Sequence, residues 1–207
     1  MLSRPIRKNL FITFHYLSHS QTLTPSIEPV TVSVASCVFT ITGGASGIGA
    51  ATARILAKQE AAAVHVADWD TSKFKQIKDE LEAINPHAKF FIEQVGVSSS
   101  SSVRSWIQGV VDQSGAIHGC LNAAAVAQVM SDPSPTEPIV FRERDEEIES
   151  VININYKGVV YCTREQTAAM VNLPKGSHPS IVNVASCEPE HIPGGYTYSA
   201  SKVAWFD

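Results

Sequence analysis

The sequence lacks paired cysteines, a basic stripe and a long hydrophobic run. Its four cysteines lie far apart and form no Cys-x-x-Cys pair: Cys37, Cys120, Cys162 and Cys187. This spacing argues against a disulfide framework and against a metal site, and it favours reduced thiols in a cytoplasmic protein. Because the net charge is −4 and no basic stripe interleaves with aromatic residues, nucleic acid is not expected as a partner. The apolar stretches are also too short and interrupted to cross a membrane.

Acidic residues are absent from the start of the chain until Glu28, whereas Arg4, Arg7 and Lys8 and many Ser and Thr residues are present. This composition is typical of a mitochondrial transit peptide, which makes a mitochondrial location the alternative to a cytoplasmic one. The other interpretation is a disordered or wrongly assigned leader. We therefore expect residues 1–36 to be a leader and residues 37–207 to form one domain.

From residue 36 onward, short apolar runs alternate with longer amphipathic segments. Strands are expected at 36–42, 62–68, 89–95, 117–126 and 179–186, and helices at 47–60, 72–84, 102–113, 142–171 and 196–205. Strands and helices that alternate at this spacing form βαβ units. The sequence therefore predicts an α/β fold: a doubly wound parallel sheet, Rossmann-like, in a three-layer αβα arrangement, with no second core.

The segment TGGASGIG, residues 42–49, lies between the first strand and the first helix and contains four glycines. One glycine can form a tight turn, another lets the backbone approach a pyrophosphate, and a third allows close packing of helix on strand. The helix N-terminus adds free N–H groups and a positive dipole end. A purely structural turn is the alternative. The residues predicted to bind a dinucleotide here are Gly43, Ser46, Gly47, Ile48 and Gly49.

An acidic residue, Asp68, ends the second predicted strand, 19 residues after Gly49. The carboxylate that accepts from the ribose 2′-hydroxyl of NAD is expected about 20 residues after such a loop. The same carboxylate repels the 2′-phosphate of NADP. Neither Ser46 nor Trp69 provides a basic side chain at this point, so the sequence favours NAD over NADP as the cofactor.

Tyr198 and Lys202 are four residues apart, so on a helix they share one face. Two charges about 4 Å apart interact by roughly 4 kcal/mol at an effective dielectric constant of about 20. An ammonium at that distance would lower the pKa of a phenol by about three units, which brings it close to the working pH of a general acid or base. A surface helix with this spacing by chance is the alternative.

Taken in order, the motifs TGGASGIG, LNAAA, NYKG, NVAS and YSASK resemble the short-chain dehydrogenase/reductase family over about residues 37–205. The resemblance implies that Tyr198 is the catalytic acid/base and that Lys202 binds the nicotinamide ribose and lowers the tyrosine pKa. It implies that Ser186 hydrogen-bonds the substrate oxygen, that Asn155 holds a relay water, and that Asn122 lies beside the adenosine. Each polar residue also has a structural interpretation: Ser186 as a strand end, Asn155 as a helix residue bonded to backbone, and Asn122 as a pin between strands.

The sequence departs from the family pattern at several positions. Three alanines follow Asn122, and Gly96 stands where the family usually has an aspartate that contacts adenine. Ser186 and Tyr198 are 12 residues apart, one fewer than is common in the family. The family usually continues well beyond the lysine, whereas Asp207 ends this chain. We therefore expect a domain that lacks its last strands, with the strand 179–186 left as an open edge.

The sequence supports two hypotheses. The first is an NAD-dependent oxidoreductase that interconverts a secondary alcohol and a ketone, with a small-molecule substrate and a possible homo-oligomer through the helices of Asn155 and Tyr198. The second is a truncated, non-catalytic remnant that binds a nucleotide weakly or associates with an intact relative. A metal-dependent hydrolase has little support, because His178 and His191 lie in predicted loops without a paired ligand spacing. His191 is instead a candidate for substrate contact.

Overall fold

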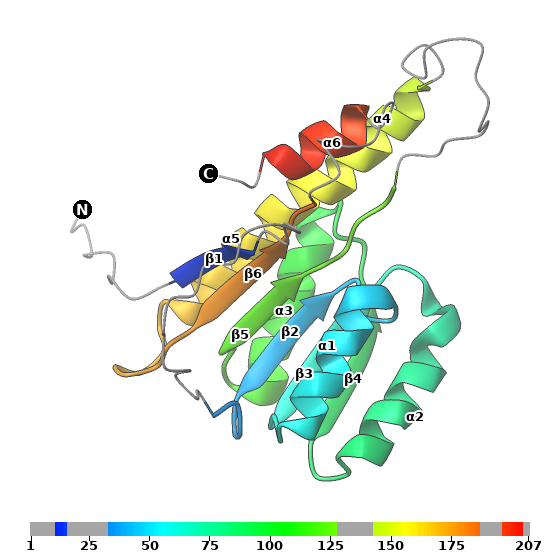
Figure 1. Cartoon of the computed structure of the whole chain (residues 1–207). Helices are drawn as coiled ribbons and strands as arrows, with labels where there is room; N and C mark the ends of the chain where they lie inside the picture. Colours follow the sequence, from blue (N-terminus) through cyan, green and yellow to red (C-terminus); the bar gives the residue numbers. More distant parts are fainter. Residues whose placement is uncertain (1–10, 16–32, 128–142, 187–195, 205–207) are drawn as a thin grey trace, which may run out of the picture.

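The computed structural model describes residues 33–127, 143–186 and 196–204, together with the backbone of residues 11–15 (Figure 1). All strand pairs in the described residues are parallel and belong to one sheet, in the order β1-β6-β5-β2-β3-β4. The strands are β1 (Phe11–His15), β2 (Val38–Thr42), β3 (Ala63–Asp68), β4 (Lys89–Gln94), β5 (Gly119–Asn122) and β6 (Ser180–Val184). The helices are α1 (Gly47–Lys58), η1 (Thr71–Lys73), α2 (Phe74–Ile84), α3 (Ser100–Ser114), α4 (Asp145–Val151), η3 (Ile152–Gly158), α5 (Val159–Met170) and α6 (Tyr196–Val203).

Helices cover both faces of the sheet, which confirms the predicted doubly wound fold. Figure 1 shows α1 and α2 on one face and α3 and α5 on the other. The inner strand β3, between β2 and β4, contributes to both faces, since successive side chains of a strand point in opposite directions. Val64 and Val66 belong to the core cluster under α1 and α2, whereas Ala63 and Ala67 belong to the cluster under α3 and α5. In the described parts of the chain, no helix is long and apolar enough to cross a bilayer.

Three buried amide side chains, which we call the amide cluster, join β5, β6 and α5. They are Asn122, Asn183 and Gln166, each at most 2% exposed. Asn122 Nδ2 donates to Asn183 Oδ1 at 2.8 Å and to Gln166 Oε1 at 2.9 Å, and Gln166 Nε2 donates to Asn122 Oδ1 at 2.9 Å. Asn122 and Asn183 are also directly paired across the two strands. The cluster holds the carboxyl ends of β5 and β6 against the helix.

The helix predicted over 142–171 consists of α4, η3 and α5 in direct succession, and its middle part was not predicted. Residues 152–158 of η3 form a π-helix, which is wider than an α-helix and is often found at functional positions. Asn155 lies in this stretch and is fully buried. Gly158 is the last residue of this stretch and packs closely on Val97, since a Cβ there would come within 2.9 Å of a methyl carbon of Val97. The sequence pattern showed helical periodicity but gave no sign of the wider turn.

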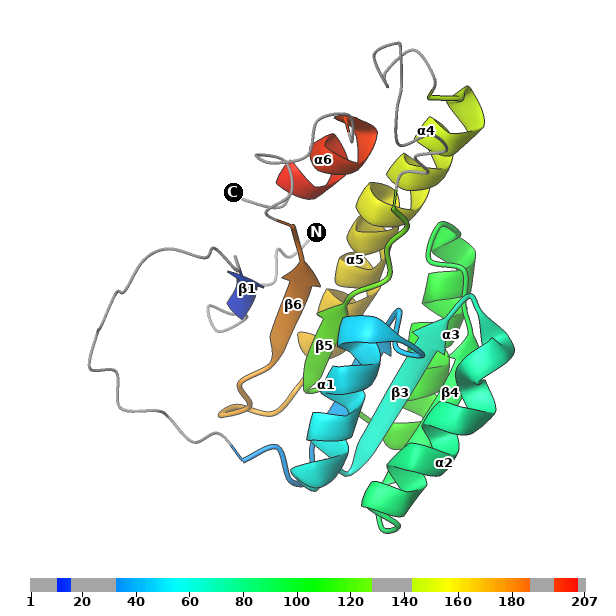
Figure 2. The same ribbon diagram turned by 45° about the vertical axis from the view of Figure 1, so that its right-hand side comes forward.

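The prediction that strand 179–186 would be an open edge is wrong. β1 pairs with β6 in parallel along its whole length, from Phe11 opposite Ser180 to His15 opposite Val184 (Figure 2). An unpaired strand edge presents a row of free N–H and C=O groups that an extended segment can satisfy. The segment FITFH is rich in β-branched and aromatic residues, which favour strands. Residues 11–15 of the predicted leader therefore belong to the sheet, while a targeting role of residues 1–36 stays a prediction.

We expect a double substitution, Ile12→Pro with Thr13→Pro, to expose the edge of β6. Successive residues of a strand direct their N–H groups to opposite sides, so one of these two donates towards β6, and proline removes that donor. Size-exclusion chromatography should show earlier elution of the variant, as chains associate through the exposed edge. The pair Ile12→Ala with Thr13→Ala keeps both donors and serves as the control. An unchanged elution volume of the proline variant would contradict a role of β1 in covering β6.

Candidate active site

The glycine loop adopts a conformation that other residues could not reproduce. Gly43 and Gly47 have φ angles of +65° and +49°, in the left-handed region that favours glycine. A Cβ at Gly43 would lie 2.7 Å from the backbone nitrogen of Ala124, and one at Gly49 would overlap the carbonyl oxygen of Gly43. A Cβ at Gly47 would meet nothing within 4 Å. Gly43 therefore allows the tight turn and Gly49 the close packing, whereas Gly47 leaves space open above the backbone.

The N-terminus of α1 faces a cavity beside this loop. Ser46 is the N-cap residue, and its side chain makes no capping hydrogen bond, while its carbonyl accepts from the N–H of Ala50 at 3.0 Å. The N–H groups of the first turn have no partner within the helix, and no acidic residue occupies that turn. Gly47, Ile48 and Gly49 all line the cavity. This end of the cavity therefore suits an anion such as a phosphate.

Asp68 connects the end of β3 to the glycine loop. Its Oδ2 accepts from the N–H of Ala45 at 3.0 Å, and its Oδ1 accepts from the N–H of Asp70 at 3.1 Å. A carboxylate oxygen can accept two hydrogen bonds, so each oxygen keeps capacity for a further donor such as a ribose hydroxyl. Because Asp68 is only partly buried and lines the same cavity, it can meet a ligand there.

The cavity has a volume of about 600 Å³, within the range of small-molecule and cofactor sites. Its described lining comes from the glycine loop, the ends of β3 and β4, and the segment after β5: Gly43, Ser46, Gly47, Ile48, Gly49, Ala67, Asp68, Trp69, Asp70, Val95, Gly96, Val97, Ser98, Ala123, Ala124, Ala125, Val126 and Ile154. All five loop residues predicted to bind a dinucleotide are in this lining, as is Asp68. The open space at Gly47, the free helix N-terminus and the carboxylate fit the parts of such a cofactor.

Asn155 links this cavity to α6. Its Oδ1 accepts from the N–H of Val126 at 2.9 Å, and its Nδ2 donates to the carbonyl of Val126 at 3.0 Å and to Ser201 Oγ at 3.3 Å. Ser201 is also buried, and its Oγ donates to the carbonyl of Tyr198 at 2.7 Å. The side chain of Asn155 thus fixes the cavity wall after β5 and the helix that contains Tyr198. The relay water predicted for Asn155 stays a prediction.

Lys202 and Tyr198 lie on α6 above the end of β6. Lys202 Nζ donates to the carbonyl of Val184 at 3.0 Å and lies 5.8 Å from the centroid of the Tyr198 ring. The lysine is only 3% exposed, and burial lowers its pKa. Tyr198 itself is half-buried. Burial disfavours the charged form of the lysine, whereas an ammonium held near the Tyr198 ring favours the phenolate through charge attraction.

Ser186 follows β6 by two residues and is half-buried. The described lining of the glycine-loop cavity contains neither Ser186 nor Tyr198 nor Lys202. The structure therefore gathers the predicted residues into two groups, one at the glycine loop and one at α6 and β6, which Asn155 connects. His191 and the loop at 130–138 lie outside the described residues. His178 is exposed, and the described residues contain no group of three possible metal ligands.

Asn122 is absent from the described lining of the cavity, although the next residue, Ala123, is part of it, so the predicted contact with the adenosine stays a prediction. Its side-chain amide is part of the amide cluster, and it is 2% exposed. The second interpretation, a pin between strands, agrees with this position. Asparagine after an apolar strand is compatible with both roles, and only the three-dimensional arrangement brings Gln166 and Asn183 to it. Trp69 also lines the cavity, and no motif in the sequence indicates this position.

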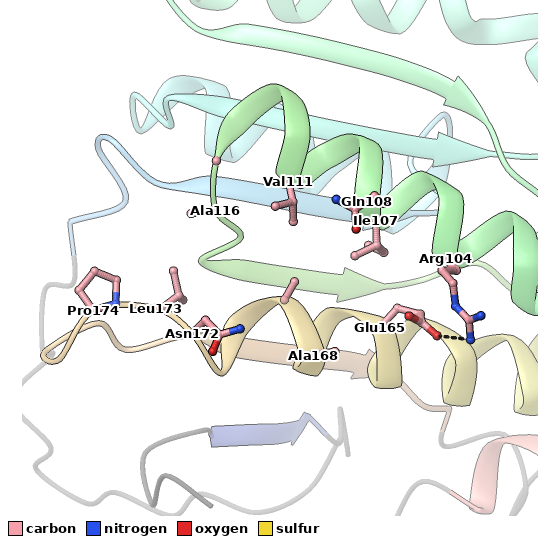
Figure 3. A pocket seen from close by; sticks show the side chains of 12 residues that line it. Arg104, Ile107, Gln108, Val111, Ala116, Glu165, Ala168, Asn172, Leu173 and Pro174 are labelled. Atoms are coloured by element: carbon pink, nitrogen blue, oxygen red, sulfur yellow. Dashed lines mark hydrogen bonds and ion pairs between the residues drawn. The ribbon is translucent and has the colours of Figure 1, made fainter. Parts of the chain in front are cut away.

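A second cavity, of about 540 Å³, lies between α3 and α5 (Figure 3). Ile107, Val111 and Leu173 contribute apolar walls, and Arg104 and Glu165 form an ion pair at 3.4 Å. Its glycine, Gly115, ends α3 instead of preceding a helix, none of its described lining belongs to the first turn of a helix, although Arg104 of α3 lies just after one, and Arg104 and Glu165 neutralise each other. The cavity beside the glycine loop is therefore the candidate cofactor site.

Comparisons with known proteins identify relatives over most of the chain. The family model for short chain dehydrogenases matches residues 37–206. A chanoclavine-I dehydrogenase of Aspergillus fumigatus is 44% identical over 173 residues, and one of Claviceps purpurea is 40% identical over 173 residues. In both cases the match covers 83% of this chain and 65% of the relative. The chain thus spans about 65% of the length of these curated relatives.

Solved structures show the same fold. A levodione reductase is 26% identical with a TM-score of 0.70, and the match covers 82% of this chain and 62% of that one. An NAD+-bound xylitol dehydrogenase is 22% identical with a TM-score of 0.72, and the match covers 84% of this chain and 62% of that one. Three observations lead to the same family: the order of the sequence motifs, the parallel sheet with a glycine loop at its carboxyl edge, and the relatives named above. The chain belongs to the short-chain dehydrogenase family.

Proposed function

We propose that this protein is an NAD-dependent oxidoreductase that interconverts a secondary alcohol and a ketone. The observation that carries the proposal is the position of Lys202, buried and 5.8 Å from the Tyr198 ring. The same helix is tied through Asn155 to the wall of the glycine-loop cavity. This arrangement supports an acid/base pair beside a cofactor site.

The cavity would hold the cofactor through groups already in position. The first turn of α1, at Gly47, Ile48 and Gly49, would bind the pyrophosphate, and Asp68 would accept from the ribose. When bound, the nicotinamide accepts a hydride from an alcohol carbon or donates one to a carbonyl carbon. NAD is proposed rather than NADP because a carboxylate at Asp68 repels a 2′-phosphate.

The residues of α6 and β6 would handle the proton and the substrate oxygen. In oxidation, the Tyr198 phenolate takes the hydroxyl proton, and in reduction the phenol returns it. Lys202 stabilises the phenolate, because its ammonium is buried at short range and its one described hydrogen-bond partner is a neutral carbonyl. Ser186 would hydrogen-bond the substrate oxygen, and Asn155 would hold a water that passes the proton to solvent.

The substrate is proposed to be a small molecule with an alcohol group. The curated relatives are named chanoclavine-I dehydrogenases, so chanoclavine-I is the first compound to test, beside a panel of secondary alcohols and ketones. The purified full chain should change the absorbance of the reduced nicotinamide with at least one of them. Folded protein that binds NAD but turns over none of the panel would favour the second candidate below.

The second candidate is a non-catalytic protein that binds a nucleotide weakly or associates with an intact relative. It is favoured by the described lining of the glycine-loop cavity, which contains neither Ser186 nor Tyr198 nor Lys202. A possible homo-oligomer stays a prediction. It is supported by exposed apolar side chains of the helices that we expected to associate: Tyr156, Val160, Tyr196 and Val203.

We expect Asp68→Ser to weaken NAD binding by about 10-fold or more, because hydrogen bonds to charged groups contribute about 1.5–3 kcal/mol. NADP should bind more tightly than before, since the repulsion of its 2′-phosphate is removed. Calorimetric titration with both cofactors measures the change. Asp79→Ser is the matched control, because Asp79 is an exposed aspartate on α2 that does not line the cavity. An unchanged ratio of NAD to NADP affinity in the Asp68 variant would contradict the proposed selection.

A further inference from the structure

An indole side chain stands exposed at the rim of the candidate cofactor cavity. Trp69 is 72% exposed, the highest value among the exposed large hydrophobic side chains in the described residues. It follows Asp68 directly and lines the cavity. An aromatic ring left in water at a concave site gains contact energy when a flat ligand covers it. The free protein therefore leaves most of the indole surface exposed to water.

The backbone under this ring is held in place. The carbonyl of Trp69 accepts from Gln94 Nε2 at 3.0 Å, and the N–H of the next residue, Asp70, donates to Asp68 Oδ1 at 3.1 Å. The ring lies against Gly96, since a Cβ built there would be 3.4 Å from Trp69 Cζ3 and 3.5 Å from Cε3. These distances correspond to ordinary van der Waals contact, so the indole packs beside the backbone of Gly96 at the end of β4.

The charges around Trp69 select the part of a dinucleotide that can approach it. Asp68 and Asp70 flank it in sequence, and both line the cavity. Two carboxylates disfavour a phosphate at this position, whereas the N-terminus of α1 favours one. An uncharged, planar ring is therefore the group that suits Trp69. Because Gly96 carries no side chain, recognition at that position cannot use a side-chain hydrogen bond to the edge of the ring.

We propose that Trp69 is the stacking platform for the base of the cofactor, and that it recognises the plane of the base rather than its edge. The proposal rests on the proposed function, because it assigns a role within the same dinucleotide site. Stacking of a base on an aromatic side chain contributes about 5- to 150-fold to affinity when measured by alanine substitution. A contact through the ring face is also tolerant of the atoms on the edge of the base.

The test compares Trp69→Phe and Trp69→Ala in the full chain, with NADH and reduced nicotinamide hypoxanthine dinucleotide as calorimetric ligands. We expect Trp69→Ala to bind both about 10-fold or more weakly and Trp69→Phe to stay close to the unaltered chain. The unaltered chain should bind the two dinucleotides with similar affinity, since they differ at the edge of the base. Val171→Ala, a substitution of another exposed apolar residue outside this cavity, is the control.

Three results would overturn the inference: equal binding by Trp69→Ala and the unaltered chain, equal loss in Trp69→Phe and Trp69→Ala, or strong preference of the unaltered chain for adenine. The first shows that the ring does not contact the ligand, the second that stacking is not the contact, and the third that the edge is recognised. If the unaltered chain binds neither dinucleotide, the proposed function fails together with the inference. Binding without any effect of Trp69 overturns the inference alone.

Discussion

Tyr198→Phe is expected to lower kcat/KM by about 10²- to 10⁴-fold, the contribution of a positioned general acid or base. The substitution removes one oxygen atom and keeps the ring that lies 5.8 Å from Lys202 Nζ. Substrate and cofactor should still bind, because the glycine loop and Asp68 are unaltered. The loss should therefore appear mainly in kcat, measured from the absorbance of the reduced nicotinamide.

Tyr196→Phe provides a matched control for this substitution. Tyr196 lies on the same helix, two residues earlier, and is 55% exposed. Its phenol is not part of the proposed acid/base pair, so kcat/KM of this variant should equal that of the unaltered chain. Equal activity of the Tyr198 and Tyr196 variants would show that the phenol at position 198 moves no proton in the rate-limiting step.

Acidification is expected to destabilise the fold through His65. This residue lies in β3 and is fully buried, with its ring stacked on Phe91 at a centroid distance of 4.3 Å. Its Nε2 is 2.8 Å from Ser114 Oγ, and its Nδ1 has no hydrogen-bond partner within the described parts of the chain. Burial lowers the pKa of His65 from 6.5 to about 4. The neutral ring is thus the form that the folded protein accommodates.

The sign of this change in stability follows from which state of the chain binds the proton. Between about pH 6.5 and pH 4 the unfolded chain binds a proton at His65 that the folded chain does not, so this contribution to stability falls as the pH falls. It is complete above about pH 6.5, and the loss approaches about 3 kcal/mol near pH 4. Urea unfolding at a series of pH values measures the free energy of unfolding directly.

A variant isolates His65 from the carboxyl groups that also titrate in this range. In His65→Gln the amide can still reach Ser114, but no proton is taken up at position 65 on unfolding. The pH dependence of the free energy of unfolding should therefore become shallower by about 3 kcal/mol over this interval. His87→Gln, at an exposed position in the turn after α2, should keep the full dependence. A His65 variant with the slope of the unaltered chain would contradict the assignment.

Much of the fold could be predicted because it depends on local patterns. The glycines of the loop and the alternation of strands and helices follow from short-range rules on backbone conformation and periodicity. The start of α3 obeys such a rule: Ser99 Oγ accepts from the N–H of Ser102 at 3.2 Å, as an N-cap does. Gly43 and Gly49 likewise occupy positions where a Cβ would collide with backbone.

The features that escaped prediction depend on contacts between distant segments. β1 joins β6 across more than half of the sequence, and no local pattern in FITFH names its partner. The wider turn in η3 contains Asn155, which bonds to Val126, but the sequence around it has ordinary helical periodicity. The indole of Trp69 lies against Gly96, which belongs to another strand connection. The candidate residues and their chemistry could be predicted from the sequence, but not which of them are in contact in the fold.

The amide cluster has a consequence for how the sheet assembles. The aliphatic side chains of β5 and β6 differ little in size, so they contribute little to the choice between possible alignments of the two strands. A shift of β5 against β6 would separate Asn122 from Asn183 and place each amide beside aliphatic groups. Every buried polar group left without a partner costs about 1–3 kcal/mol. The three amides therefore favour one register of β5 against β6. They do so at the end of β5, where the chain leaves the sheet and begins to line the cofactor cavity.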